Sequence, residues 1–221
     1  MEMDSFGRTL IQAQPYATEK PNKVEVLIEN APDEFISKYS KVPKDECEYI
    51  YTGMSFYKQL INYGGLMLHS SAVVVDGAAY LFTADSGTGK STHTSLYLRE
   101  FGDRAFILND DKPAIRFEDG GFYAYGTPWS GKNAYNTNLR VPIAGICVLH
   151  RGKKNEISRI HGKSAILGIY SQTLRPQSAK YMDKLLVLIE KLIELVPIWE
   201  LKCNTDPDAP RVSYDAMSSV K

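Results

Sequence analysis

The segment Ala84–Ser91, with the sequence Ala-Asp-Ser-Gly-Thr-Gly-Lys-Ser, constrains the fold of this chain more than any other. It matches the phosphate-binding loop pattern except at the first position, where alanine replaces glycine. Gly87 and Gly89 allow successive backbone N–H groups to point at phosphate oxygens, and a following helix adds its positive N-terminal end. Because this loop works between a strand and a helix, the segment predicts an α/β fold that binds nucleotide phosphates.

Individual side chains of the loop have separate predicted roles. Lys90 can reach the β- and γ-phosphates as a mobile cation, and Ser91 can place its hydroxyl on Mg²⁺. Alanine at position 84 matters only if that position needs a positive φ angle, which alanine resists. The residues predicted to bind the nucleotide are Asp85, Ser86, Gly87, Thr88, Gly89, Lys90, Ser91 and Thr92.

The residues around the loop supply the strand and the helix that it needs. Two apolar, β-branched runs, 66–75 and 78–83, come before it, and Asp76-Gly77 between them is a strong hairpin-turn signal. An antiparallel hairpin is therefore expected to lead into the loop. A helix is expected from about Lys90 to Phe101, followed by a short buried strand over 105–108.

The first third of the chain has weaker patterns. Residues 1–20 are polar and irregular, and we expect them to be loosely ordered. Alternating apolar residues predict a strand over 23–28, and a second short strand is predicted over 48–51. Gly53 is expected to break the chain before a helix over 54–63.

The rest of the chain continues the α/β pattern. The predicted elements are a hairpin from 114–117 and 122–125, a strand over 143–149 paired with 156–160, a long amphipathic helix over 182–196 that ends at Pro197, a strand over 198–201 and a final helix that opens near Asp206. Since no repeat or low-complexity linker interrupts these elements, we expect residues 1–221 to form one domain, a mixed sheet with helices packed on it.

Composition excludes some classes of function. The 26 Lys and Arg residues balance 26 Asp and Glu residues, which argues against nucleic acid or an anionic membrane as the main partner, because both need a basic excess. The three cysteines have no metal-ligand or redox spacing, so we expect reduced thiols. No apolar run approaches the ~20 residues of a membrane span, and the N-terminus lacks the apolar region of a secretory signal. These features predict a cytoplasmic protein.

Asn109-Asp110-Asp111 ends the short strand after the loop helix, where phosphate-binding-loop proteins hold Mg²⁺ through a carboxylate. With two adjacent carboxylates, one can face the metal while the other accepts a proton from an acceptor hydroxyl. The alternative is an Asx-type turn that only ends the strand. His69, in the predicted strand before the loop, is either part of this site or a satisfied core residue.

The stretch from Leu68 to Asp111 resembles the catalytic core of HPr kinase/phosphorylase. That family has a histidine in a strand, a β-hairpin, a Gly-x-Ser-Gly-x-Gly-Lys-Ser loop and a strand that ends in paired aspartates. His69, the loop from Ser86 to Ser91, and Asp110-Asp111 reproduce this order at similar spacing. The loop is also similar to that of ATP-dependent phosphoenolpyruvate carboxykinase, whose nucleotide-binding fold is related.

The resemblance implies a role for each matching position. Lys90 and the loop amides would hold ATP, Ser91 would bind Mg²⁺, and Asp111 would be the general base. Asp110 would support the metal or orient its neighbour, and His69 would lie in the active site. The implied fold is that of the C-terminal domain of HPr kinase. Because relatives in this family assemble, the resemblance leaves a homo-oligomer open.

Several features depart from the family. The glutamate-bearing signature for Mg²⁺ and HPr docking is not recognisable, and Gly126–Lys132 occupies its general region. There Trp129 would either stack on a base or an acceptor or fill the core, and Lys132 would pair with phosphate. Arg175 and the proline after it are weakly similar to an active-site Arg-Pro. The sequence looks more like the small, stand-alone HPr-kinase-like proteins, some of which modify peptides.

The sequence therefore predicts an Mg²⁺- and ATP-dependent kinase that phosphorylates a hydroxyl, serine-like, on a peptide, a protein or a small molecule. One alternative is a nucleotide-binding regulatory protein without phosphotransfer. The other is a phosphoenolpyruvate carboxykinase-like enzyme, which would need a carboxylate site and a second metal site that the sequence does not reveal.

Overall fold

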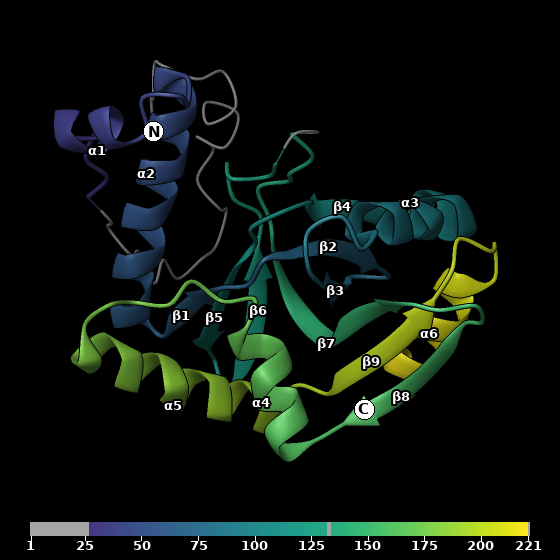
Figure 1. Ribbon diagram of the computed structural model, residues 1–221. Coiled ribbons are helices and arrows are strands. Elements are labelled where there is room, and N and C mark those ends of the chain that lie inside the picture. Colours follow the sequence, from purple (N-terminus) through teal and green to yellow (C-terminus); the bar gives the residue numbers. More distant parts are fainter. Residues whose placement is uncertain (1–26, 132–133, 221) are drawn as a thin grey trace.

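A computed structural model describes residues 27–131 and 134–220 of the chain (Figure 1). The helices in this part are α1 (Asp33–Lys38), α2 (Lys44–Leu60), the 3₁₀ helix η2 (Ile61–Tyr63), α3 (Lys90–Phe101), the 3₁₀ helix η3 (Gly102–Arg104), α4 (Gly162–Tyr170), α5 (Ala179–Leu195) and α6 (Ala209–Ser218). The strands are β1 (Gly65–Met67), β2 (Ser70–Val75), β3 (Ala78–Thr83), β4 (Ala105–Asn109), β5 (Ala114–Glu118), β6 (Gly121–Tyr125), β7 (Arg140–Arg151), β8 (Glu156–Ile160) and β9 (Ile198–Cys203).

The strands join into one mixed, curled sheet. Its main path has the order β1-β5-β6-β7-β3-β2-β4, and β9 pairs with both β7 and β8. The long strand β7 connects two parts of the sheet, because its first residues pair antiparallel with β6 and its later residues pair parallel with β3 and β9. This mixed sheet, with a hairpin before the phosphate-binding loop and helices packed on it, confirms the predicted fold class (Figure 1).

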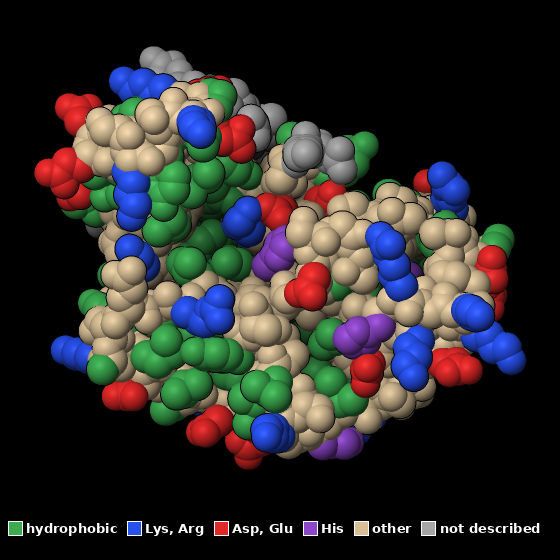
Figure 2. Space-filling model, viewed as in Figure 1, with side chains coloured by type: hydrophobic (Ala, Val, Ile, Leu, Met, Phe, Trp, Pro, Cys, Tyr) green, Lys and Arg blue, Asp and Glu red, His purple; other side chains and the backbone are tan. Residues whose placement is uncertain are grey.

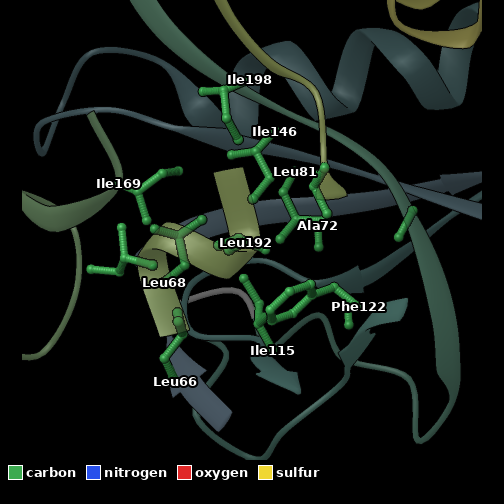
Figure 3. Packing of buried hydrophobic residues seen from close by; sticks show 14 of the residues in the cluster. Leu66, Leu68, Ala72, Leu81, Ile115, Phe122, Ile146, Ile169, Leu192 and Ile198 are labelled. Atoms are coloured by element: carbon green, nitrogen blue, oxygen red, sulfur yellow. The ribbon is translucent and has the colours of Figure 1, made fainter. Parts of the chain in front are cut away.

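Helices cover both faces of the sheet around the loop, and the alternation of side chains in the hairpin shows why. Ala72 and Leu81 point into the core beneath α4 and α5 (Figure 3), whereas Val73 and Phe82 point into the core beneath α3 and α6. Strands that are apolar on both faces need cover on both faces, so the hairpin is held firmly in the middle of the molecule. The phosphate-binding loop at the end of this hairpin is therefore also held in a fixed position.

The strand–loop–helix unit was predicted correctly at each boundary. Asp76 and Gly77 both have positive φ angles, 51° and 80°, as a tight hairpin turn requires. The helix after the loop runs over the predicted residues, Lys90–Phe101. Ala84 is not among the described residues with positive φ, so the replacement of the first loop glycine introduces no backbone strain.

In the first third of the chain the helix predicted over 54–63 is confirmed, since these residues lie in α2 and η2, but the strand predicted before it and its predicted start were wrong. The loose order expected for residues 1–20 lies outside the described residues. Residues 48–51 lie within α2 rather than in a strand, and α2 continues through Gly53. The reason is tertiary packing: a Cβ at position 53 would lie 2.9 Å from the ring of Trp129, so glycine lets that ring pack directly on the helix. Of the strand predicted over 23–28, residues 23–26 lie outside the described residues, and residues 27 and 28 belong to no strand.

Two strand predictions needed further correction. The run 66–75 is divided into β1 and β2, because residues 68 and 69 between them pair with a segment near residue 172 instead. Strand β8 pairs with β9 and not with β7, since β9 runs parallel to β7 and lies between them. Helices α1 and α4 were not predicted. No helix in the described part is long and apolar enough to cross a membrane.

Candidate active site

The phosphate-binding loop leaves β3 at Thr83 and enters α3 at Lys90. The Nζ atom of Lys90 donates a hydrogen bond to the Ala84 carbonyl oxygen at 2.9 Å, so the side chain folds back across the loop. Burial lowers the pKa of Lys90, and the nearby carboxylates of Asp111 and Asp85 partly oppose that shift. The ammonium group of Lys90 is therefore already positioned within the loop that is expected to bind phosphates.

The backbone of the loop has room for a ligand. Gly87 and Gly89 have positive φ angles, and a Cβ built on either would meet no atom within 4 Å. The space above these backbone groups is therefore open, as a loop that cradles phosphates requires. Ser91 is half-buried and Thr92 exposed in the first turn of α3.

Asp110 is held by hydroxyl groups from two other elements. Its Oδ1 accepts a hydrogen bond from Ser71 Oγ at 2.7 Å, and Ser71 Oγ lies 2.8 Å from Thr94 Oγ1. Only 8% of Asp110 is exposed. Because Ser71 gives its one hydroxyl proton to Asp110, Thr94 of α3 donates to Ser71, and the carboxylate of Asp110 is thereby tied to the loop helix.

Asp111 lies between two basic side chains. Its Oδ1 is 3.2 Å from His69 Nε2, and its Oδ2 is paired with Lys112 Nζ. Burial by itself raises the pKa of Asp111, but the hydrogen bond with His69 and the charge of Lys112 outweigh it, so the net pKa is lowered. Asp111 is therefore an ionised carboxylate at neutral pH.

A hydrogen-bonded chain continues from Asp111 to the phosphate-binding loop. His69 Nδ1 is 3.2 Å from Gln172 Oε1, and Gln172 Nε2 donates to Asp85 Oδ1 at 3.0 Å. Because a carboxylate only accepts, the Gln172 amide must present its oxygen to His69. Both ring nitrogens of His69 then face acceptor oxygens. We call this chain, Asp85–Gln172–His69–Asp111–Lys112, the relay.

Several residues that the sequence analysis missed position the relay. His69 donates its backbone N–H to the Gln172 carbonyl at 2.8 Å, and Asp111 accepts one from Ser70 at 3.0 Å. Asn109 Oδ1 accepts the backbone N–H groups of Asp111 and Lys112 at 3.0 and 2.7 Å, which forms an Asx turn. The Asx turn and a role of Asp110 and Asp111 in the site are therefore compatible, because the turn fixes where the two carboxylates lie.

The segment 126–131 supports this turn from behind. Asn109 Nδ2 donates to the Thr127 carbonyl at 2.9 Å, and Thr127 and Tyr57 both donate their hydroxyl groups to the Lys112 carbonyl. A Cβ at Gly131 would lie 3.1 Å from Asp111 Cβ, so the segment passes directly against the relay.

The structure corrects the expectation that Trp129 stacks on a ligand. Trp129 is 2% exposed, its Nε1 donates to the Tyr49 carbonyl at 2.9 Å, and its ring stacks on Phe56 with centroids 5.1 Å apart. It fills the core between α2 and the sheet, which is the second of the two interpretations. Lys132 lies outside the described residues. Arg175 is exposed and lines a cavity beside the phosphate-binding loop.

The charges of this site fit a magnesium–nucleotide ligand. Asp85, Asp110 and Asp111 contribute three carboxylates around Lys90 and the open loop. An anionic phosphate chain placed there needs a divalent cation to offset these charges. In the described residues no group of three or more His, Cys, Asp or Glu side chains could hold a metal ion. Magnesium, however, is usually bound by one or two carboxylates together with phosphates and water, which Asp110 and Ser91 suit.

The fold and the site define a mixed α/β protein with a phosphate-binding loop and a carboxylate–histidine relay beside it. No family model and no curated protein matches the sequence. Among solved structures, the chain is similar to the Hpr(Ser) kinase/phosphatase from Coxiella burnetii, with 16% sequence identity and a TM-score of 0.31, over 58% of this chain and 92% of that chain.

Proposed function

We propose that this protein is an Mg²⁺- and ATP-dependent kinase that transfers the γ-phosphoryl group to a serine-like hydroxyl on a peptide, a protein or a small molecule. The observation that supports this most is the position of Asp111. It is an ionised, partly buried carboxylate, and the relay connects it to the phosphate-binding loop. A protein that only binds nucleotides has no need for such a group.

Different residues of the site have different roles in phosphoryl transfer. Lys90 and the backbone amides from Ser86 to Ser91 bind and orient the triphosphate. Asp110 and Ser91 hold Mg²⁺, which neutralises phosphate charge when bound. Asp111 accepts the proton of the acceptor hydroxyl as that oxygen attacks phosphorus. His69 and Lys112 keep Asp111 unprotonated and fix its direction.

An acceptor needs access to Asp111. Figure 2 shows that the molecule is hollowed between α2 and α5, and that hydrophobic side chains form the floor of this hollow. Lys112, which follows Asp111 in the chain, is next to α2, since its carbonyl oxygen accepts a hydrogen bond from Tyr57. We infer that the acceptor approaches through this hollow.

The proposal is tested by incubating the protein with Mg²⁺, γ-labelled ATP and size-fractionated extract of the source cell. We expect label in one fraction, whose identity shows whether the acceptor is a peptide, a protein or a metabolite. Asp111→Asn should bind ATP in calorimetry but transfer no label, and Lys90→Ala should lose both properties. Asp215→Asn, an exposed aspartate on α6, is the matched control and should behave as the wild type.

Other outcomes would assign another function. If the wild type binds Mg-ATP but labels nothing in any fraction, a regulatory nucleotide-binding protein replaces the kinase. If ADP forms from ATP only when oxaloacetate is added, a carboxykinase-like reaction replaces it. Undiminished transfer by Asp111→Asn would remove Asp111 as the base.

A further inference from the structure

The ion pair between Asp111 and Lys112 involves the same carboxylate that the proposed function uses as a base. Oδ1 of Asp111 lies 3.2 Å from His69 Nε2, and Oδ2 is paired with the ammonium group of Lys112. The backbone at Gly131 also lies close, since a Cβ there would be 3.1 Å from Asp111 Cβ. Both oxygens of the carboxylate therefore have a basic partner before an acceptor arrives, and the acceptor hydroxyl has to compete with one of them.

Of these two partners, Lys112 is the one that is free to leave. His69 is held from its other side, where Nδ1 lies 3.2 Å from Gln172 Oε1 and the backbone N–H donates to the Gln172 carbonyl. The side chain of Lys112 is 35% exposed, and among the described residues Asp111 is the one partner of its ammonium group. Ion pairs that solvent reaches are weak, because water and salt screen them. A competing anion can therefore draw Lys112 away from Asp111.

The backbone of Lys112, in contrast, is fixed at both of its polar groups. Its N–H donates to Asn109 Oδ1 at 2.7 Å, and its carbonyl oxygen accepts hydrogen bonds from the hydroxyl groups of Tyr57 and Thr127. Only the side chain of Lys112 can then move. An anion that takes the ammonium group from Asp111 has to bind within reach of this one side chain, and therefore directly beside Asp111.

The surroundings of Lys112 favour an anion that comes from the acceptor. The hydrogen bond from Tyr57 places the Lys112 backbone next to α2, which forms one side of the hollow through which we infer that the acceptor approaches. Figure 2 shows several Lys and Arg side chains bordering this hollow. A cationic border favours a ligand that carries negative charge. The triphosphate has a cation of its own in the loop, Lys90, whose Nζ is held at the Ala84 carbonyl.

We propose that Lys112 is a specificity-determining residue that selects an acceptor with a carboxylate next to the hydroxyl. This carboxylate takes the ammonium group of Lys112 from Asp111, and Asp111 Oδ2 then accepts the hydroxyl proton. The hydroxyl oxygen bonds to the γ-phosphorus while the bond from that phosphorus to the β-phosphate oxygen breaks, and ADP leaves with the electron pair. The inference rests on the proposed function, because it defines the acceptor of the same site.

The test uses the extract fraction that the wild type labels, before and after its carboxyl groups are converted to amides with a carbodiimide and ammonia. Amidation should lower kcat/KM of the wild type for the acceptor by about tenfold or more. Lys112→Met should act on both forms of the fraction equally, whereas Lys112→Arg should keep the preference for the untreated form. Lys163→Met, an exposed lysine on α4, is the matched control and should discriminate as the wild type does.

The size of the labelled molecule distinguishes two sources of the carboxylate. An acidic residue near a serine in a peptide or protein gives label in a fraction of peptides or proteins. The carboxyl group of a small hydroxy acid gives label in the fraction of metabolites.

The outcomes separate this inference from the proposed function. If the wild type labels no fraction, both are overturned. If it labels the untreated and the amidated acceptor at equal rates, the role of Lys112 is overturned and the kinase proposal stands. Equal losses on amidation in the wild type and in Lys112→Met would also overturn it, because the loss would then not depend on Lys112. Weakened binding of Mg-ATP by Lys112→Met in calorimetry would assign the lysine to the triphosphate instead.

Discussion

The burial of His93 makes the stability of the loop helix sensitive to acid. His93 lies in α3 one turn after Lys90 and is 3% exposed. Its ring packs against Phe82 with centroids 4.6 Å apart, its Nε2 lies 3.1 Å from Ser213 Oγ, and its Nδ1 has no hydrogen-bond partner in the described structure. Burial lowers the pKa of His93 from 6.5 to about 4, so the folded protein holds this side chain neutral.

The sign and size of the effect follow from this shift. Between pH 6.5 and pH 4 the unfolded chain binds a proton at His93 that the folded protein does not. The neutral, buried side chain of His93 therefore makes its full contribution to the free energy of unfolding above pH 6.5. This contribution decreases as the pH falls toward 4. At pH 5 the loss relative to pH 7 is about 2 kcal/mol, from roughly 1.5 pH units at 1.36 kcal/mol each.

Urea unfolding at pH 7 and at pH 5 measures this loss. Other groups also titrate, so the wild type is compared with His93→Leu, which cannot be protonated. The free energy of unfolding should fall between the two pH values by about 2 kcal/mol more in the wild type than in the variant. In addition, the ring resonances of His93 should not titrate in the folded protein above pH 5. An equal loss in both proteins, or a titration near pH 6.5, would refute this account of His93.

Three further predictions concern the relay and the core. Gln172→Leu should lower kcat by about 10-fold or more while Mg-ATP affinity stays unchanged, because Gln172 positions His69 and does not touch the phosphates; an unchanged kcat would contradict this. Lys112→Ala should raise the pKa of Asp111 and move the acid limb of the pH–rate profile to higher pH, and a profile that does not move would show that Lys112 has no such effect. Trp129→Ala should cost ~3–5 kcal/mol in urea unfolding yet leave ATP affinity of the folded protein intact, whereas lost affinity with full stability would restore Trp129 as a ligand contact.

The parts of the structure that local chemistry determines were predictable from the sequence. Asp76-Gly77 specified a tight hairpin, and the loop residues specified where β3 ends and α3 begins. Asp110 and Asp111 stood at the end of a strand, and that position was correct. In each case the signal lies within a few residues of the feature that it specifies.

The parts that depend on distant contacts were not predictable. Gly53 resembles a helix breaker, but the ring of Trp129 packs against it and the helix continues. Strand β9 comes late in the chain and still lies between β7 and β8. Gln172 belongs to no motif and is brought to His69 from 103 residues away, so nothing near it in the sequence marks it as part of the relay.

Phosphorus NMR of Mg-ATP, followed in time with the protein and the acceptor-containing fraction, tests the central claim most directly. The account predicts that the γ-phosphate resonance disappears while resonances of ADP and of a new phosphate ester appear, and that Asp111→Asn prevents this change. Formation of ADP with inorganic phosphate alone, or an unchanged ATP spectrum with the wild type, would contradict it.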